Sequence, residues 1–228
     1  MLSPVEVDAL LLSLKVAFWS VVCSLPFGVM LAWILARRDF PGKSLLDGLL
    51  HLPLVLPPVV IGYLLLVTLG RNGLIGKVLY EQFGVSIAFT WKGAVAASAV
   101  MAFPLLVRTV RLSFDAVDTR LEMAARTLGA APQRVFFTIT LPLSIPGIIA
   151  GMVLAFARSL GEFGATIIFV SNIPGRTQTL PLALYTMTQT PGGEAAAMRL
   201  CGIAVVIALL ALTGANRLEK RYARHVGG

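Results

Sequence analysis

Two opposite charges, Arg158 and Glu162, lie four residues apart inside an otherwise apolar stretch of the chain. Residues at this spacing face each other along one side of a helix, so the two side chains can form an ion pair. Charges in apolar surroundings are costly, and they pair with each other or face a polar cavity. The pair, with Ser159 beside it, therefore predicts a mutually satisfied ion pair, the polar lining of a conduit, or both. Gly161 and Gly164 allow a close helix approach or local unwinding here.

Three prolines, Pro53, Pro57 and Pro58, fall within six residues of another apolar stretch. Proline has no backbone N–H, and its ring clashes with a carbonyl of the preceding helical turn. In apolar surroundings the freed carbonyls need protein or water as partners. The prolines predict a broken helix. Pro57 and Pro58 then either face a translocation path or only shape the packing of the helices.

Spacing excludes a nucleotide-binding loop. The run Gly42-Lys43-Ser44 matches the end of a phosphate-binding loop, but that motif needs a glycine five positions before Gly42. Position 37 is an arginine, and the run lies in a short turn between two apolar stretches. We therefore expect this chain to hold no ATP and no other cofactor.

The sequence also lacks the sets of residues that form metal sites and catalytic sites. The only histidines are His51 and His225, and the only cysteines are Cys23 and Cys201. Their positions fit no zinc site, no catalytic triad and no disulfide framework. We expect no catalytic residue and no metal ligand. His51 is expected to be an interfacial hydrogen-bonding group, and both cysteines are expected to be small buried side chains.

The composition places these residues in a membrane protein. Of 228 residues, 57% are hydrophobic and only 13% are charged, whereas a soluble domain has about a quarter charged. Mean hydropathy is +0.85. The net charge of +8 could suggest nucleic acid, but the basic residues lie between apolar blocks, where they mark cytoplasmic loops and contact anionic lipid. Nucleic-acid binding is therefore not expected.

Five stretches are long and apolar enough to cross a bilayer, which needs roughly 20 residues per helix. The predicted spans are residues 9–36, 49–70, 93–110, 145–170 and 195–215. A sixth span could lie at 74–89, but Lys77, Glu81 and other polar groups there favour an external amphipathic loop or interfacial helix. We predict an all-α integral membrane protein with one domain over residues 1–228.

Lysine and arginine set the orientation of such a protein. Of the 19 in the chain, twelve lie in segments 37–48, 108–144 and 216–228, and five lie in the alternating set of segments. The excess predicts an external N-terminus and a cytoplasmic C-terminus.

The loop at about 115–143 is the longest basic segment and is predicted to be cytoplasmic. Asp118 can cap a helix, and Gly129 is well placed to end it. One face of this helix carries small or apolar residues at helical spacing: Leu121, Ala124, Ala125 and Leu128. Such a face can dock into a groove on a partner, or it can lie on its own bundle or on the lipid surface.

The same loop resembles the "EAA" coupling loop of ABC-importer permeases. That motif has Glu-Ala-Ala, three residues, Gly, nine residues and then Ile-x-Leu-Pro. Here Ala124-Ala125 is followed by Gly129 at the family spacing and by the run from Ile139 to Pro142. The family's glutamate position holds Met123, and Glu122 stands one place before it. The resemblance implies that Glu122, Ala124, Ala125, Leu128, Gly129 and Pro142 couple the chain to an ATPase.

Further runs, at 51–63, 156–166, 171–175 and 189–193, resemble the molybdate permeases of this family, and the likeness covers about residues 11–218. It implies the type I ABC importer architecture in a bacterial inner membrane. It also implies a homodimer, two ATPase subunits that carry ATP and magnesium, and an external molybdate-binding protein. Pro57, Pro58, Arg158, Ser159 and Glu162 are then candidates for the translocation path.

Alternatives remain open at this point. The permease could carry another tetrahedral oxyanion, tungstate or sulfate. The chain could also be a secondary anion transporter or a small channel, although we see no inverted repeat of the kind that many secondary transporters show.

Overall fold

The computed structural model describes residues 3–226, and all regular secondary structure in this range is helical. This confirms the predicted all-α class. The helices are α1 (Pro4–Arg37), α2 (Lys43–Val55), α3 (Pro58–Leu69), α4 (Leu74–Phe83), α5 (Trp91–Asp115), α6 (Thr119–Thr127), α7 (Pro132–Val135), the π-helix η1 (Phe136–Thr140), α8 (Leu141–Leu160), α9 (Gly164–Val170), α10 (Leu180–Gln189) and α11 (Glu194–Val226).

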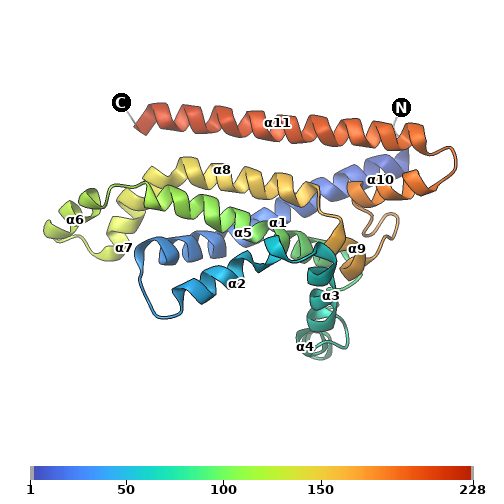
Figure 1. Cartoon of the computed structure of the whole chain (residues 1–228), viewed down its shortest axis with the longest axis horizontal. Helices are drawn as coiled ribbons and strands as arrows, with labels where there is room; N and C mark the ends of the chain where they lie inside the picture. Colours follow the sequence, from blue (N-terminus) through green and yellow to red (C-terminus); the bar gives the residue numbers. More distant parts are fainter. Residues whose placement is uncertain (1–2, 227–228) are drawn as a thin grey trace.

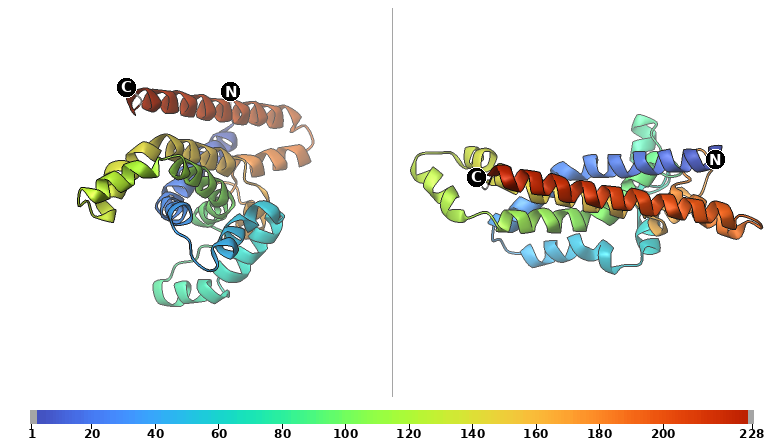
Figure 2. Two further views of the ribbon diagram at one scale, coloured as in Figure 1. Left: turned by 60° about the vertical axis from the view of Figure 1, so that its left-hand side comes forward. Right: turned by 90° about the horizontal axis from the view of Figure 1, so that it is seen from above.

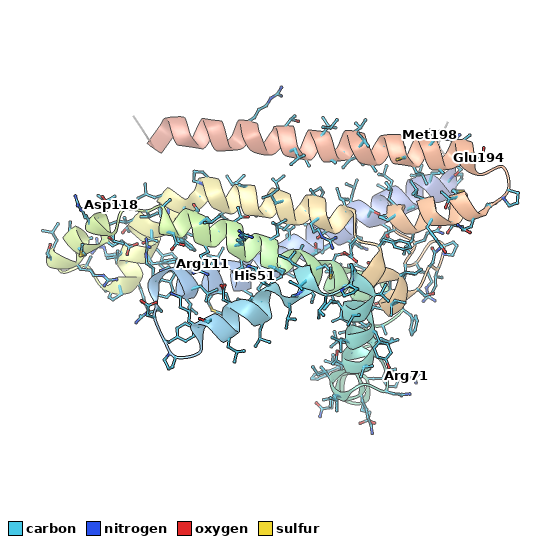
Figure 3. The ribbon with its side chains drawn as sticks, viewed as in Figure 1. His51, Arg71, Arg111, Asp118, Glu194 and Met198 are labelled. Carbon is cyan, nitrogen blue, oxygen red and sulfur yellow. The ribbon has the colours of Figure 1, made fainter. Side chains whose placement is uncertain are left out.

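Helices α1, α5 and α8 form the centre of the bundle (Figure 1). A buried cluster that includes Ala32, Leu106, Val110 and Ala155 joins them. Figure 2 shows α11 running along one side of this centre, while α2, α3 and α4 lie on another. Asp118, just before α6, marks one end of the bundle, and Glu194 at the start of α11 marks the opposite end (Figure 3).

Four helices in the described part are long and apolar enough to cross a membrane alone: Pro4–Arg37, Trp91–Asp115, Pro132–Leu160 and Glu194–Gly214. A fifth span arises if α2 and α3 count together, although their axes differ by 112°. The predicted number of about five spans is thus confirmed with the bent pair as one span. The break falls at Leu56 and Pro57, in the proline cluster that predicted it.

The predicted fourth span, 145–170, has the wrong bounds. The continuous helix starts earlier, at Pro132, and ends at Leu160, and the chain resumes a helical path only in α9. Gly161 follows α8 as its cap. The carboxylate of Glu162 accepts a hydrogen bond from the backbone N–H of Ala165 at 2.8 Å. This side chain thus satisfies a free donor at the start of α9, which allows a new helix to begin.

The sixth span considered at 74–89 is not found within the described residues. Helix α4 has ten residues, which amounts to about 15 Å, and it ends at Gly84 in the left-handed conformation. This is half of the roughly 30 Å of a hydrocarbon core. Lys77 and Glu81 lie on its exposed surface. The short helix with its exposed charges fits the amphipathic helix that was the alternative to a sixth span.

Two charged side chains of α1, those of Glu6 and Lys15, contact residues of other helices. Glu6, which is buried, accepts a hydrogen bond from Arg199 at 3.0 Å and thereby joins α1 to α11. The ammonium group of Lys15 lies 3.9 Å from the ring centroid of Trp91, at the start of α5. Such cation–π contacts stabilise an ammonium group that has little water around it. The lysine inside the first span therefore lies against an aromatic face.

The prediction that both cysteines are buried is wrong. Cys23 and Cys201 are exposed on the surface of α1 and α11. The same surface carries large apolar side chains, among them Phe27 on α1 and Leu210 on α11. In a bilayer such residues face acyl chains, so an apolar residue need not lie in the protein core.

Candidate functional site

Helix α6 forms a tip at one end of the bundle. The side chain of Asp118 caps its start by accepting the backbone N–H of Arg120 at 2.9 Å. Leu128 is its C-cap, and Gly129 follows with φ of +86°, in the left-handed region that favours glycine. The helix therefore has the start and the end that the residue types predicted.

One side of α6 faces away from the rest of the protein. Leu121 and Ala124 are exposed, Ala125 is half-buried, and Leu128 is 89% exposed. No atom lies within 4 Å of the position that a Cβ on Gly129 would take. We call this surface, made of Leu121, Ala124, Ala125, Leu128 and Gly129, the docking face. An apolar face without cover at the tip of a bundle is suited to contact with another protein.

Glu122, unlike the residues of the docking face, is turned toward the bundle and is buried. Its Oε1 accepts hydrogen bonds from Arg37 Nε at 3.1 Å and Arg37 Nη2 at 3.0 Å. The hydroxyl of Thr140 donates to the same oxygen at 2.8 Å. We call these three residues the Glu122 clamp. The clamp joins α6 to the last residue of α1 and to the end of η1, and Arg37 also donates to the Val117 carbonyl at 3.3 Å.

The π-helix η1 places Thr140 in the clamp. It joins α7 to α8 within one continuous helix as a stretch of wider turns, and such wide turns are frequent at functional sites. Pro142 follows in the first turn of α8, where the missing N–H of a proline costs little, and is half-buried. Pro142 therefore belongs to α8 and is not part of the docking face.

The two helix breaks meet in space. A Cβ on Gly164, at the start of α9, would lie 2.7 Å from the ring of Pro58, at the start of α3. A Cβ on Gly62 would lie 2.6 Å from the carbonyl oxygen of Ala165. Only glycine permits this close crossing of α3 and α9. The starts of α3 and α9, each directly after a helix break, thus pack against each other.

Arg158 and Glu162 form the ion pair that their spacing predicted, with Arg158 Nη1 at 2.7 Å from Glu162 Oε2. The Glu162 side chain is 1% exposed, whereas that of Arg158 is 30% exposed. Ser159 is buried, and its hydroxyl is hydrogen-bonded to that of Ser20 at 2.8 Å. Of these residues, Arg158 has the accessible polar atoms, while Ser159 holds α8 against α1.

A polar cluster lies between α2 and α5, and the sequence analysis did not predict it. Asp47 forms an ion pair with Arg111 at 3.1 Å, and its backbone carbonyl is hydrogen-bonded to the His51 ring at 2.7 Å. Figure 3 shows His51 and Arg111 close together. Arg108 also lines the adjoining cleft of about 360 Å³. The spacing of Asp47 and His51, one helical turn apart, was the available signal, and the expected hydrogen bond of His51 is present.

The Glu122 clamp generates a prediction for the loop. Glu122→Gln removes the charge that faces the Arg37 guanidinium, and a hydrogen bond to a charged group contributes roughly 1.5–3 kcal/mol. We expect amide hydrogen exchange in residues 117–129 to become at least about tenfold faster, since local opening costs less. The control is Glu81→Gln, which breaks the exposed Lys77–Glu81 pair. Exchange in 117–129 that stays as slow as in the control would show that the clamp does not hold the loop.

Known proteins with similar sequences are transport permeases. The chain is 65% identical over 207 residues to the molybdenum transport system permease protein ModB of Escherichia coli K12, which covers 91% of this chain and 90% of that protein. It is 61% identical to ModB of Haemophilus influenzae, with 97% of each chain covered. It is 37% identical to the sulfate transport system permease protein CysT of Salmonella typhimurium, with 99% and 81% covered.

Solved structures with the same fold come from ABC transporters. A bacterial transporter that imports the polysaccharide alginate matches with a TM-score of 0.77 at 16% identity, covering 96% of this chain and 80% of that one. The MetNI methionine transporter in an inward-facing conformation matches with a TM-score of 0.68 at 16% identity, covering 95% and 94%.

The family model described as "Binding-protein-dependent transport system inner membrane component" matches residues 24–224. The match includes α6, the Glu122 clamp and both helix breaks. The chain therefore belongs to the family of inner membrane components of binding-protein-dependent transport systems.

Proposed function

We propose that this chain is the membrane-spanning permease subunit of an ATP-driven importer of molybdate. The observation that carries the proposal is the 65% identity to a molybdenum permease over 91% of the chain. The exposed docking face at the tip of the bundle supports it, because a permease without its own nucleotide site needs a surface that contacts the ATPase. The lower identity to the sulfate permease, 37%, favours molybdate over sulfate.

Two copies of the chain form the pore in this proposal. Two ATPase subunits carry ATP and magnesium and bind at the end where α6 lies. An external molybdate-binding protein docks at the opposite end, on the segment from Asn172 to Gly193. One solved alginate transporter contains a substrate-bound periplasmic protein, which supports this arrangement for a chain of the same fold. The N-terminus is external and the C-terminus is cytoplasmic, as the distribution of Lys and Arg predicts.

The docking face transmits the movement of the ATPase. Each α6 inserts into a cleft of one ATPase subunit through Ala124, Ala125 and Leu128. Glu122 faces inward, so we assign it the role of a positioning residue that makes α1 and α8 follow α6. ATP binding then favours an outward-open arrangement, and release after hydrolysis restores the inward-open one.

The broken helices lie along the translocation path in this proposal. Pro57, Pro58 and Glu162 hold the crossing of α3 and α9, while Arg158 presents donors to the passing anion. A tetrahedral dianion needs hydrogen-bond donors, but a conduit must not hold it tightly. Because Arg158 is already paired with Glu162, its attraction for a second anion is weakened. Ser159 contributes through the packing of α8 on α1.

Uptake into proteoliposomes tests the function. The complex of this chain with its ATPase and binding protein should transport labelled molybdate only when ATP is present on the side of the membrane where the ATPase subunits lie. Tungstate should compete strongly and sulfate weakly. Uptake driven by an ion gradient alone would make the chain a secondary transporter, and current without ATP would make it a channel. Equal competition by sulfate would reject molybdate selectivity for the complex.

The docking face is tested by Gly129→Asp. The new carboxylate adds volume and charge to the docking face, so we expect normal insertion but at least a tenfold loss of ATP-driven uptake. Gly42→Asp is a matched control, because Gly42 has φ of +90° and open space around its Cβ position, outside the docking face. Both variants bear similar backbone strain. Uptake lost equally in the control, or retained in Gly129→Asp, would contradict the assignment.

A further inference from the structure

A groove of about 840 Å³ lies between α1 and the segment from Ala131 to Leu141. Its walls are mostly apolar: Met30 and Trp33 come from α1, and Phe136 and Phe137 come from η1. The Trp33 and Phe136 rings meet edge to face with centroids 5.5 Å apart. The groove is separate from the docking face and from the two helix breaks.

One charged side chain lines the groove. Arg38, the residue after α1, lines it together with Gln133. The guanidinium carbon of Arg38 lies 5.8 Å from the ring centroid of Trp33. Arg37 is used by the Glu122 clamp, whereas no ion pair or side-chain hydrogen bond of Arg38 is found among the described side chains. An exposed guanidinium at the rim of an apolar groove complements an amphiphile with an anionic head.

The length of the groove also indicates its occupant. Its lining on α1 runs from Pro26 to Arg38, which is about 18 Å at 1.5 Å per residue. One leaflet of a bilayer core is about 15 Å thick. The groove therefore matches a molecule that extends through one leaflet, with its head at Arg38, and it is too short for a membrane-spanning helix.

We propose that this groove binds an anionic phospholipid of the cytoplasmic leaflet. The phosphate contacts Arg38 and Gln133, and an acyl chain lies along Met30, Trp33 and Phe137. Basic pockets between membrane helices on the cytoplasmic side bind such headgroups. The site rests on the orientation stated under the proposed function, which puts the end of α1 on the cytoplasmic side. A lipid here supports the end of α1 that carries the Glu122 clamp.

Fluorescence quenching of Trp33 tests the site without any transport assay, so its outcome is independent of the proposed function. Trp19→Phe and Trp91→Phe leave Trp33 as the only tryptophan. The chain is placed in phosphatidylcholine vesicles with a minority of phosphatidylglycerol, and bromine is put on the acyl chains of one lipid or the other. We expect about fivefold enrichment of phosphatidylglycerol at Trp33, since one arginine near the surface contributes about this factor.

Arg38→Gln should abolish the enrichment. Arg217→Gln is the control. Arg217 is exposed in the last third of α11, on the side of the membrane that the proposed orientation also gives to Arg38. Native mass spectrometry of the unmodified chain should independently show retained phosphatidylglycerol and little phosphatidylcholine.

Three outcomes would overturn the proposal. Equal quenching by the two lipids means ordinary annular lipid. Enrichment that survives in Arg38→Gln means that the headgroup is held elsewhere. Absence of quenching by either lipid means that protein, such as a second copy of the chain, covers the groove.

Discussion

The largely buried ion pair between Arg37 and Glu122 joins two parts of this molecule that lie far apart in sequence. Arg37 is the last residue of α1, and Glu122 lies in α6, 85 positions further along the chain. Removing two charges from water is costly, and the cost is offset only by good geometry and further hydrogen bonds. Thr140 and the Val117 carbonyl supply those bonds. With the carboxylate of Glu122 turned inward, Leu121, Ala124 and Leu128 of α6 face outward.

A second constraint acts at the helix breaks. Within a bilayer, free backbone groups must be satisfied by protein or water, so a broken helix is tolerated only where it is covered or lines a cavity. Here the break after α2 and the break before α9 cover each other, through the contact of Gly164 with Pro58 and that of Gly62 with Ala165. Glu162 joins this arrangement to Arg158. The crossing of α3 and α9 therefore brings together irregular backbone and the polar side chains of Arg158 and Glu162.

Local features of the sequence predicted much of this structure. Apolar runs predicted the spans, prolines predicted the break at Pro57, and Asp118 and Gly129 predicted the start and end of α6, because each effect depends on neighbouring residues. The Arg158–Glu162 pair could be predicted for the same reason. The Glu122 clamp could not, since nothing near Glu122 in sequence indicates Arg37. The burial of Cys23 was predicted wrongly, because an apolar residue in a bilayer can face either protein or lipid. The 112° bend depends on the packing of α3 on α9, which is equally non-local.

The central claim is that the outer side of α6 contacts the ATPase, and crosslinking from Leu128 measures this most directly. A photo-activatable residue at position 128, where the side chain is 89% exposed, is activated in the assembled complex. A matched probe at Leu210, which is 66% exposed on the flank of α11, reports the lipid-facing surface. We expect position 128 to crosslink to the ATPase and position 210 to lipid. Crosslinks from position 128 that reach only lipid, or the external binding protein, would contradict the claim.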